Sequence, residues 1–451
     1  MRENERMMTV DSPHIICINP WIHDFAAYDF WAKPLGLLFL AAVLRAHGMR
    51  VSYVDCLDRF HPKADHPGYS ADGRGPYRKT PIPAPEPLAD VPARFSRYGI
   101  DPRWLAADLA SAGRPDLVLV TSLMTYWYTG VAETIAAVKR LYPDTKVLLG
   151  GIYATLLPEH ALVHTGADEV LPGPAEATIF RAIEKYTGFS CRPDFDPADM
   201  GAFPYPAFDL QSEIPYAPLL TARGCPNRCA YCASHVLQPR RMRRLPENAA
   251  AEIAYWNDRF GVRNFAFYDD ALLADAEDHA IPLLERIAAM KKDLSFHTPN
   301  ALHVRPMTSK IADLMVKAGF ATIRLGLERA DGKSRDIDDK VHHEEFVRAV
   351  RLLLEAGFDE KQIGAYLLVG LPGQDLSSVE ASIDTVKACG IRPVLAYYTP
   401  IPRTRMWEAA CRASRYDLAA EPLFTNNSLM PCMPEYDRPL INRLKQRASA
   451  A

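Results

Sequence analysis

The chain has 451 residues, of which 48% are hydrophobic and 24% are charged. This length allows two or three domains, and the composition is typical of a folded globular protein. The formal net charge of −3 argues against nucleic acid as a partner. Residues 1–11 contain no apolar signal segment, and the longest apolar stretch, residues 35–44, is too short to span a bilayer. The scattered cysteines fit a reducing compartment, so we expect a cytoplasmic protein without a membrane partner.

Residues 12–190 alternate short apolar strands with helical stretches. The pattern favours an α/β fold in which helices cover a parallel sheet. We predict a flavodoxin-like (Rossmann-like) domain, whose ligands bind at the carboxyl ends of the strands. The predicted strands are 14–19, 51–55, 116–120, 146–151 and 169–171, and the predicted helices are 34–47 and 131–141.

Two of these strand ends carry candidate binding residues. Ser122 follows the strand 116–120, and Gly150 and Gly151 close the next strand. Glycine lets a ligand approach the backbone because it has no Cβ atom. Paired glycines at a strand end also serve as a plain turn, so this signal is weak by itself.

Two segments interrupt the alternation. Residues 61–113 are rich in proline, aspartate, arginine and glycine, which predicts an insertion loop with little regular structure. Residues 191–216 form a second proline-rich run, which we interpret as an interdomain linker.

Residues 217–413 show a regular alternation of strands and helices. Six such units predict an open partial (β/α)6 TIM barrel with its chemistry at the carboxyl ends of the strands. Residues 414–451 are predicted to be a short C-terminal tail. The predicted strands are 219–221, 264–267, 294–297, 322–327, 363–369 and 393–398. The predicted helices are 246–260, 278–292, 309–318, 344–356, 376–388 and 405–413.

Three cysteines follow the first barrel strand with the spacing C-x3-C-x2-C. They are Cys225, Cys229 and Cys232. A cubane iron–sulfur cluster held entirely by protein takes four thiolates, so three would leave one iron open to an exchangeable ligand. A structural zinc site usually takes two pairs of ligands, and no second pair is present. A ferredoxin takes a fourth cysteine at a set distance, whereas Cys389 is far along the chain.

This cysteine motif, with Arg223 and Gly224 before it and Tyr231 within it, resembles that of the radical S-adenosylmethionine (SAM) enzymes. The resemblance implies that the cysteines bind a [4Fe-4S] cluster whose open iron is chelated by the amino and carboxylate groups of SAM. It also implies cofactor contacts at three strand ends of the barrel. These contacts fall on Asp269, Glu328 and Gly370, and Tyr231 is a further cofactor-binding candidate.

Two of these candidates have a structural alternative. The carboxylate of Asp269 could equally cap the following helix, and Gly370 could make a plain turn. Cys432, in the tail, could be a reactive thiol, but a packed cysteine is the simpler interpretation.

The first domain resembles the amino-terminal domain of cobalamin-binding radical SAM proteins. The resemblance rests on the order of Pro34 to Leu38, Gly150-Gly151 and Pro172 to Glu176. It implies that cobalamin binds near Ser122, Gly150 and Gly151. The D-x-H-x-x-G motif that supplies an axial histidine in other cobalamin domains is missing. We therefore expect no protein histidine on cobalt, although His23 lies in the corresponding loop.

Together these resemblances imply an enzyme that reductively cleaves SAM to form a 5′-deoxyadenosyl radical. The cobalamin domain makes methyl transfer to an unactivated carbon the leading function. Rearrangement or cyclisation with a non-binding first domain remains an alternative, as does a non-catalytic redox or cobalamin-sensing protein. The expected partners are a small-molecule or natural-product-like substrate and an external one-electron reductant of the ferredoxin or flavodoxin type.

Overall fold

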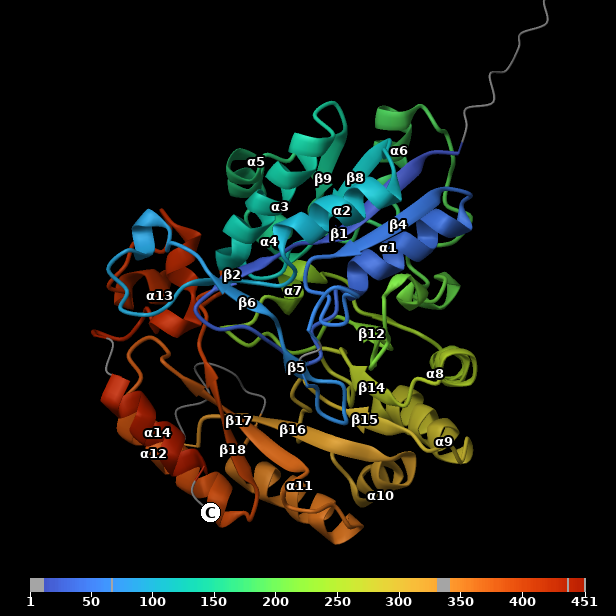
Figure 1. The fold of residues 1–451 in the computed structure, drawn as a ribbon. Helices are drawn as coiled ribbons and strands as arrows, with labels where there is room; N and C mark the ends of the chain where they lie inside the picture. The colour runs from blue at the N-terminus through green and yellow to red at the C-terminus, as the bar shows by residue number, and fades with distance from the viewer. Residues whose placement is uncertain (1–11, 66–67, 331–340, 436–437, 450–451) are drawn as a thin grey trace, which may run out of the picture.

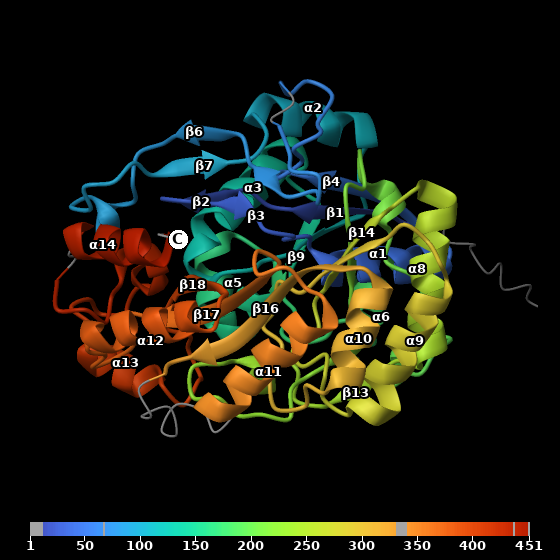
Figure 2. The same ribbon diagram turned by 90° about the horizontal axis from the view of Figure 1, so that it is seen from below.

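The computed structural model describes residues 12–65, 68–330, 341–435 and 438–449 (Figure 1). The amino-terminal part forms one parallel sheet with helices on both faces. The central part forms a second parallel sheet, with its helices on the side away from the first sheet (Figures 1 and 2). The α/β class and the order of the two sheets in the chain are as predicted.

The first sheet has five parallel strands in the order β10-β9-β8-β1-β4. In chain order this is the 2-1-3-4-5 arrangement of flavodoxin-like folds. Ile16 and Ile18 face one helical layer, while Ile15 and Cys17 face the other. Such two-sided burial explains why the strands are almost entirely apolar. The strands are β1 (His14–Asn19), β4 (Arg50–Asp55), β8 (Leu117–Val120), β9 (Lys146–Leu149) and β10 (Glu169–Val170).

Two helical layers cover this sheet. Helices α1 (Leu35–Ala46) and α6 (Ile179–Thr187) pack on one face. Helices α2 (Pro102–Ala112), α3 (Tyr128–Leu141), α4 (Ile152–Leu156) and α5 (Pro158–Thr165) pack on the other face.

The prediction of little regular structure for residues 61–113 is wrong. Strands β6 (Lys79–Pro81) and β7 (Ser96–Tyr98) join β2 (Ile22–Asp24) in a three-stranded antiparallel sheet. The end of the segment is helix α2, where the Asp101 side chain accepts a hydrogen bond from the Arg103 amide and Pro102 opens the first turn. This aspartate–proline start is a helix signal that the high proline content of the segment concealed.

The second sheet has six parallel strands in the order β11-β14-β15-β16-β17-β18, which leaves β11 and β18 as its two edges. It is therefore an open barrel, as predicted. Gly261, Gly319 and Gly357 end their helices in the left-handed conformation. The strands are β11 (Ala217–Leu219), β14 (Asn264–Phe267), β15 (Ser295–His297), β16 (Phe320–Glu328), β17 (Ile363–Val369) and β18 (Arg392–Tyr397). The helices are α8 (Pro246–Phe260), α9 (Ile281–Ala289), α10 (Ser309–Ala318), α11 (His343–Ala356), α12 (Leu376–Ala388) and α13 (Trp407–Ala413).

The segment after α13 contacts both halves of the molecule. The Asn426 amide donates to the buried Asp24 carboxylate at 2.8 Å, and the hydroxyls of Thr425 and Thr125 are 3.1 Å apart. Helix α14 (Arg438–Ser449) lies along α12 (Figure 1). The C-terminal segment therefore ties the barrel to the first domain. No helix among the described residues is long and apolar enough to cross a membrane.

Candidate active site

A cavity of about 410 Å³ lies between the two sheets. The first sheet contributes residues at the ends of β8 and β9, and the start of α1 adds a mostly apolar wall. The barrel contributes Arg223, Tyr268 and Asp270, which come from the ends of its first two strands. Because both parallel sheets present the carboxyl ends of their strands here, the cavity is the expected binding site of each fold.

The predicted residues Ser122, Gly150 and Gly151 all line this cavity. The Ser122 hydroxyl donates to the Gly150 carbonyl at 2.7 Å and accepts from the Ala154 amide at 3.2 Å. At Gly150 an added Cβ would have only the Leu171 carbonyl oxygen near it, at 3.7 Å. A side chain there would extend into the cavity, so Gly150 keeps this wall clear for a ligand.

Gly151 is required for a different reason. Its φ is +97°, and an added Cβ would lie 2.3 Å from the Ser122 carbonyl oxygen. This crowding comes from the protein backbone, whereas the sequence interpretation attributed it to a ligand. We expect Gly151→Ala to lower the free energy of unfolding by about 1–3 kcal/mol because of the strained backbone. Denaturant unfolding measures this loss, and the same loss in Gly150→Ala would contradict the assignment.

The three cysteines lie on an irregular loop between the short paired strands β12 (Ala222–Arg223) and β13 (Met242–Arg243). Cys229 is buried, and the other two are partly exposed. The Ser234 amide donates to Cys232 Sγ at 3.4 Å, and His303 Nε2 lies 4.0 Å from Cys225 Sγ.

This donor set fits an iron–sulfur cluster. No group of three metal-binding side chains in the described part of the chain surrounds a single point. A cubane cluster does not need such a group, because each of its irons takes one thiolate and the thiolates are spread around the cluster. The hydrogen bond from the Ser234 amide to Cys232 Sγ is also of the kind that tunes the reduction potential of a cluster.

Asp269 and Asp270 follow β14 but point to different surroundings. The Asp269 carboxylate is buried and accepts from the Thr221 hydroxyl and the Ala222 amide, both at 2.6 Å. Asp270 lines the cavity and accepts from the Ser234 hydroxyl at 2.7 Å. Both of the 2.6 Å bonds are to Asp269 Oδ1, and Oδ2 accepts from the Thr221 amide at 3.2 Å, so Asp269 fixes the start of the cysteine loop. Asp270 is the carboxylate that faces the cavity.

Burial raises the pKa of Asp269 from its ordinary value of 3.8 to about 6, although its hydrogen bonds oppose this shift. The unfolded chain then loses this proton at lower pH than the folded chain does. The contribution of Asp269 to stability is therefore expected to fall as pH rises from 3.8 to about 6 and to level off above that. Asp269→Asn should remove this slope, which unfolding midpoints of both proteins across this pH range would measure. Parallel pH profiles would contradict the assignment.

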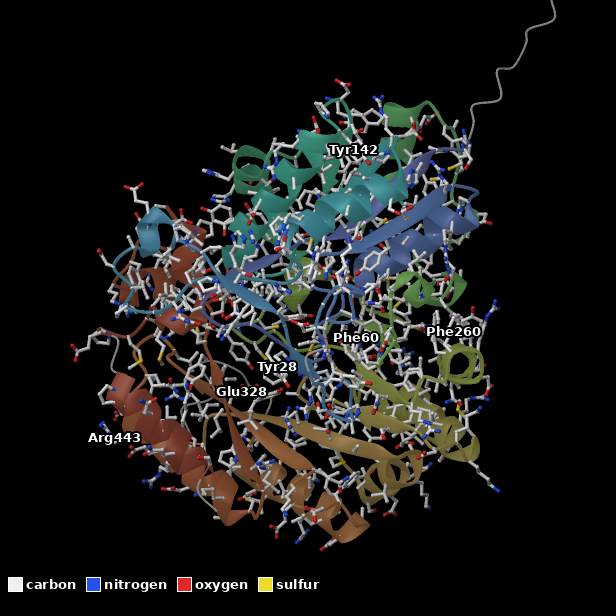
Figure 3. All side chains as sticks on the ribbon, in the orientation of Figure 1. Tyr28, Phe60, Tyr142, Phe260, Glu328 and Arg443 are labelled. Atoms are coloured by element: carbon white, nitrogen blue, oxygen red, sulfur yellow. The ribbon has the colours of Figure 1, made fainter. Side chains whose placement is uncertain are left out.

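The other predicted cofactor contacts lie at strand ends or in the cysteine loop, outside the lining of this cavity. Glu328 is buried at the carboxyl end of β16, beyond a register shift, with φ +62° (Figure 3). Gly370 has φ +87°, and its amide donates to Gln374 Oε1 at 2.7 Å. Tyr231 packs against a separate cluster that includes Cys432. Their roles toward a cofactor stay predictions.

Two further residues behave as the sequence suggested. Cys432 is buried, and its thiol donates to the Ala410 carbonyl at 3.7 Å, as a packed cysteine would. His23 Nε2 lies 2.8 Å from the Glu133 carboxylate, and Nδ1 lies 3.2 Å from the Thr129 hydroxyl. His23 is not among the residues that line the cavity. Its position therefore agrees with the expectation that it is not an axial ligand.

One pair of cavity residues was not predicted from the sequence. Glu176, from the first domain, accepts a hydrogen bond from the guanidinium of Arg223, two residues before Cys225. Both side chains are buried, and Arg223 also lies over the rings of Phe39 and Phe203. This ion pair joins the two domains at the cavity wall.

Comparisons with known proteins agree with this geometry. Residues 219–386 match the radical SAM superfamily, and residues 101–182 match the B12 binding domain. An uncharacterized methyltransferase of Pyrococcus horikoshii is 25% identical, over 66% of this chain and 69% of its own. The cytidylyl-2-hydroxyethylphosphonate methyltransferase of Streptomyces wedmorensis is 21% identical, over 83% of this chain and 77% of its own.

Solved structures share the fold. The radical SAM methyltransferase TsrM of Kitasatospora setae, solved with tryptophan substrate and a SAM analog, aligns with a TM-score of 0.65. The alignment covers 89% of this chain and 76% of TsrM at 17% identity. The chain therefore carries a B12-binding domain ahead of a radical SAM domain.

Proposed function

We propose that the protein is a cobalamin-dependent radical SAM methyltransferase that methylates an unactivated carbon of a small molecule. The single observation that carries this proposal is the cavity shared by the two domains. Ser122 and Gly150 form one wall, and Arg223 and Asp270, next to the cysteine loop, form the other. Cobalamin held at the first wall would lie opposite the cluster and SAM held at the cysteine loop, across the same cavity. The relatives named as methyltransferases support the same reaction class.

The residues have separate tasks in this proposal. Cys225, Cys229 and Cys232 would hold the [4Fe-4S] cluster, and Ser122 and Gly150 would border cobalamin. When bound, the cluster and SAM supply radical chemistry and cobalamin supplies a methyl carrier.

The surrounding residues position these groups. Asp269 anchors the cysteine loop to the second barrel strand. Asp270 lines the cavity and would offer a carboxylate to the ammonium group of SAM. The apolar wall formed by α1 excludes water, which protects reactive intermediates from side reactions.

The substrate class follows from the relatives only in outline. One relative is named for a cytidylyl phosphonate, and TsrM was solved with tryptophan. Both are small molecules of different chemistry, so we propose a small-molecule substrate without naming it. An external one-electron donor of the ferredoxin or flavodoxin type and a cytoplasmic location stay predictions.

The test is anaerobic reconstitution with iron, sulfide and hydroxocobalamin, followed by gel filtration and incubation with methyl-labelled SAM and a strong reductant. Retained cobalamin, with S-adenosylhomocysteine formed from SAM, would support methyl transfer. If only 5′-deoxyadenosine formed and no cobalamin were retained, rearrangement or cyclisation would replace methyl transfer as the proposed reaction. If SAM stayed intact, a non-catalytic sensing role would be favoured.

A further inference from the structure

The inner surface of the barrel at β16 and β17 is accessible to solvent. On β16, Ile323 and Leu325 are fully buried against the helices, whereas Arg324 between them is partly exposed. On β17, Ala365 and Leu367 are fully buried, and Tyr366 between them is partly exposed. Because side chains alternate along a strand, Arg324 and Tyr366 face the inside of the barrel. Part of each of these two side chains is therefore open to solvent on the inner surface of the barrel.

Arg324 has polar neighbours but no carboxylate partner among the described residues. Its Nη1 donates to the Ile323 carbonyl at 2.9 Å, and the Tyr366 hydroxyl lies nearby on the neighbouring strand. That hydroxyl donates in turn to the Pro299 carbonyl at 3.0 Å. Burial lowers the pKa of Arg324, and the nearby guanidiniums of Arg74 and Arg392 lower it further.

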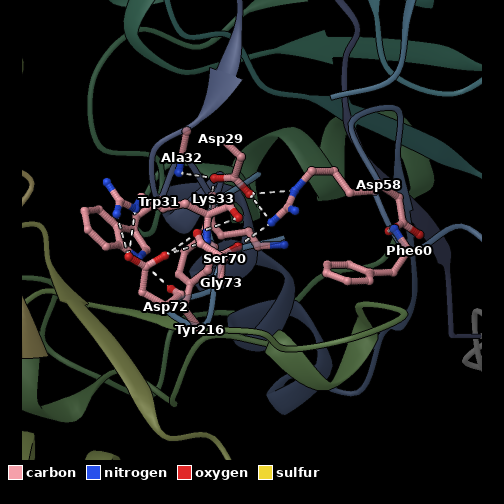
Figure 4. A network of polar contacts seen from close by, with 12 residues as sticks. Asp29, Trp31, Ala32, Lys33, Asp58, Phe60, Ser70, Asp72, Gly73 and Tyr216 are labelled. Carbon is pink, nitrogen blue, oxygen red and sulfur yellow. Dashed lines mark hydrogen bonds and ion pairs between the residues drawn. The ribbon is translucent and has the colours of Figure 1, made fainter. Parts of the chain in front are cut away.

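The neighbouring Arg74 comes from the first domain and is already neutralised. It is paired with Asp72 at 2.6 Å and lies over the Trp31 ring at 4.5 Å. Trp31 in turn stacks on His297 of β15, with ring centroids 4.6 Å apart. Figure 4 shows Trp31, Asp72 and the buried Asp29 within one polar network. This wall is thus a fixed structure beside Arg324, and its arginine already has its own counter-ion.

The fully buried arginines in the described part of the chain, Arg59, Arg223 and Arg244, each have a carboxylate partner. Arg59 is paired with Asp29, and Arg244 is paired with Glu252. A largely buried charge without a counter-ion is costly, so such charges in folded proteins usually bind something. The planar guanidinium matches the two oxygens of a carboxylate or phosphoryl group.

We propose that Arg324 binds an anionic group of the substrate, a carboxylate or phosphoryl group, inside the barrel. This proposal rests on the proposed function, because it places the substrate in the barrel of a methyltransferase. SAM also carries a carboxylate. However, Arg324 lies four residues before Glu328, about 13 Å along the strand from the end where a SAM contact is predicted. The substrate is therefore the better source of the anion.

The test uses the full-length chain, inorganic phosphate and acetate as probes, and the variants Arg324→Met and Arg324→Lys. Arg351→Met is the matched control, because Arg351 is exposed on α11 and is paired only with Glu355. We expect phosphate or acetate to raise the melting temperature of wild type and control. In Arg324→Met the affinity for the stabilising anion should be at least about tenfold weaker, because one hydrogen-bonded pair of charges is lost. The affinity of Arg324→Lys for the anion should lie between those of wild type and Arg324→Met.

Three outcomes would overturn the proposal. Equal stabilisation of Arg324→Met and wild type by the anions would show that they bind elsewhere. A melting temperature of anion-free Arg324→Met well below that of wild type would assign Arg324 a structural role, as expected for Arg244→Met. Weakened SAM binding in Arg324→Met would assign the contact to SAM. Anion binding requires neither SAM cleavage nor cobalamin, so these outcomes are independent of the proposed reaction.

Discussion

Replacing Cys225, Cys229 and Cys232 together by alanine is expected to abolish both iron binding and SAM cleavage. These residues are the three closely spaced thiols of the chain, and they share one irregular loop at the end of the first barrel strands. A cubane cluster with three protein ligands cannot be held after all three thiolates are lost. Iron and sulfide content after anaerobic reconstitution, together with 5′-deoxyadenosine formed under a strong reductant, measures the loss.

The matched control is Cys389→Ala, which removes a partly exposed thiol at the C-terminal end of α12. Burial raises the pKa of Cys389, so this thiol is a poor source of thiolate. We expect the control to bind iron and cleave SAM as wild type does. Retention of a cluster by the triple variant, or loss of the cluster in the control, would refute the assignment of the cluster ligands.

The sequence was sufficient to predict the two parallel sheets because their signals are local. Runs such as Ile15–Ile18 are apolar on both faces, as buried parallel strands require, and glycines stop the barrel helices. The three cluster cysteines likewise lie within eight consecutive positions. Each of these features depends on neighbouring residues, so one chain is enough to identify them.

The features that were missed depend on distant residues or on the direction of one side chain. Glu176 and Arg223 are 47 positions apart, and nothing local indicates that they pair. Asp269 and Asp270 are adjacent, and their roles separate only because Thr221 and Ala222 lie beside Asp269. Arg324 did carry a signal, since a lone arginine between Ile323 and Leu325 in a strand points to the opposite face. That signal was available but was not used.

The Glu176–Arg223 pair gives the second large expected effect, on stability at the domain interface. Only 9% of the Glu176 side chain and 7% of the Arg223 side chain are exposed. Glu176→Gln would leave the guanidinium buried without its counter-charge. Breaking a buried pair in this way costs about 3–5 kcal/mol, whereas an exposed pair contributes about 0–1 kcal/mol. We therefore expect a large fall in the denaturant midpoint, and looser cobalamin binding because both residues line the cavity.

The control for this prediction is Asp209→Asn, which breaks the ion pair between Asp209 and Arg45. That pair also joins α1 to a distant segment, but its side chains are 32% and 37% exposed, so the midpoint should hardly change. In the double variant Glu176→Gln with Arg223→Met the cost should be smaller than the sum of the single costs, because the uncompensated charge is gone. Additive costs, or a Glu176→Gln midpoint equal to that of the control, would mean that the two side chains do not stabilise each other. The interface would then depend on apolar contacts such as those of Phe39 and Phe203 beside Arg223.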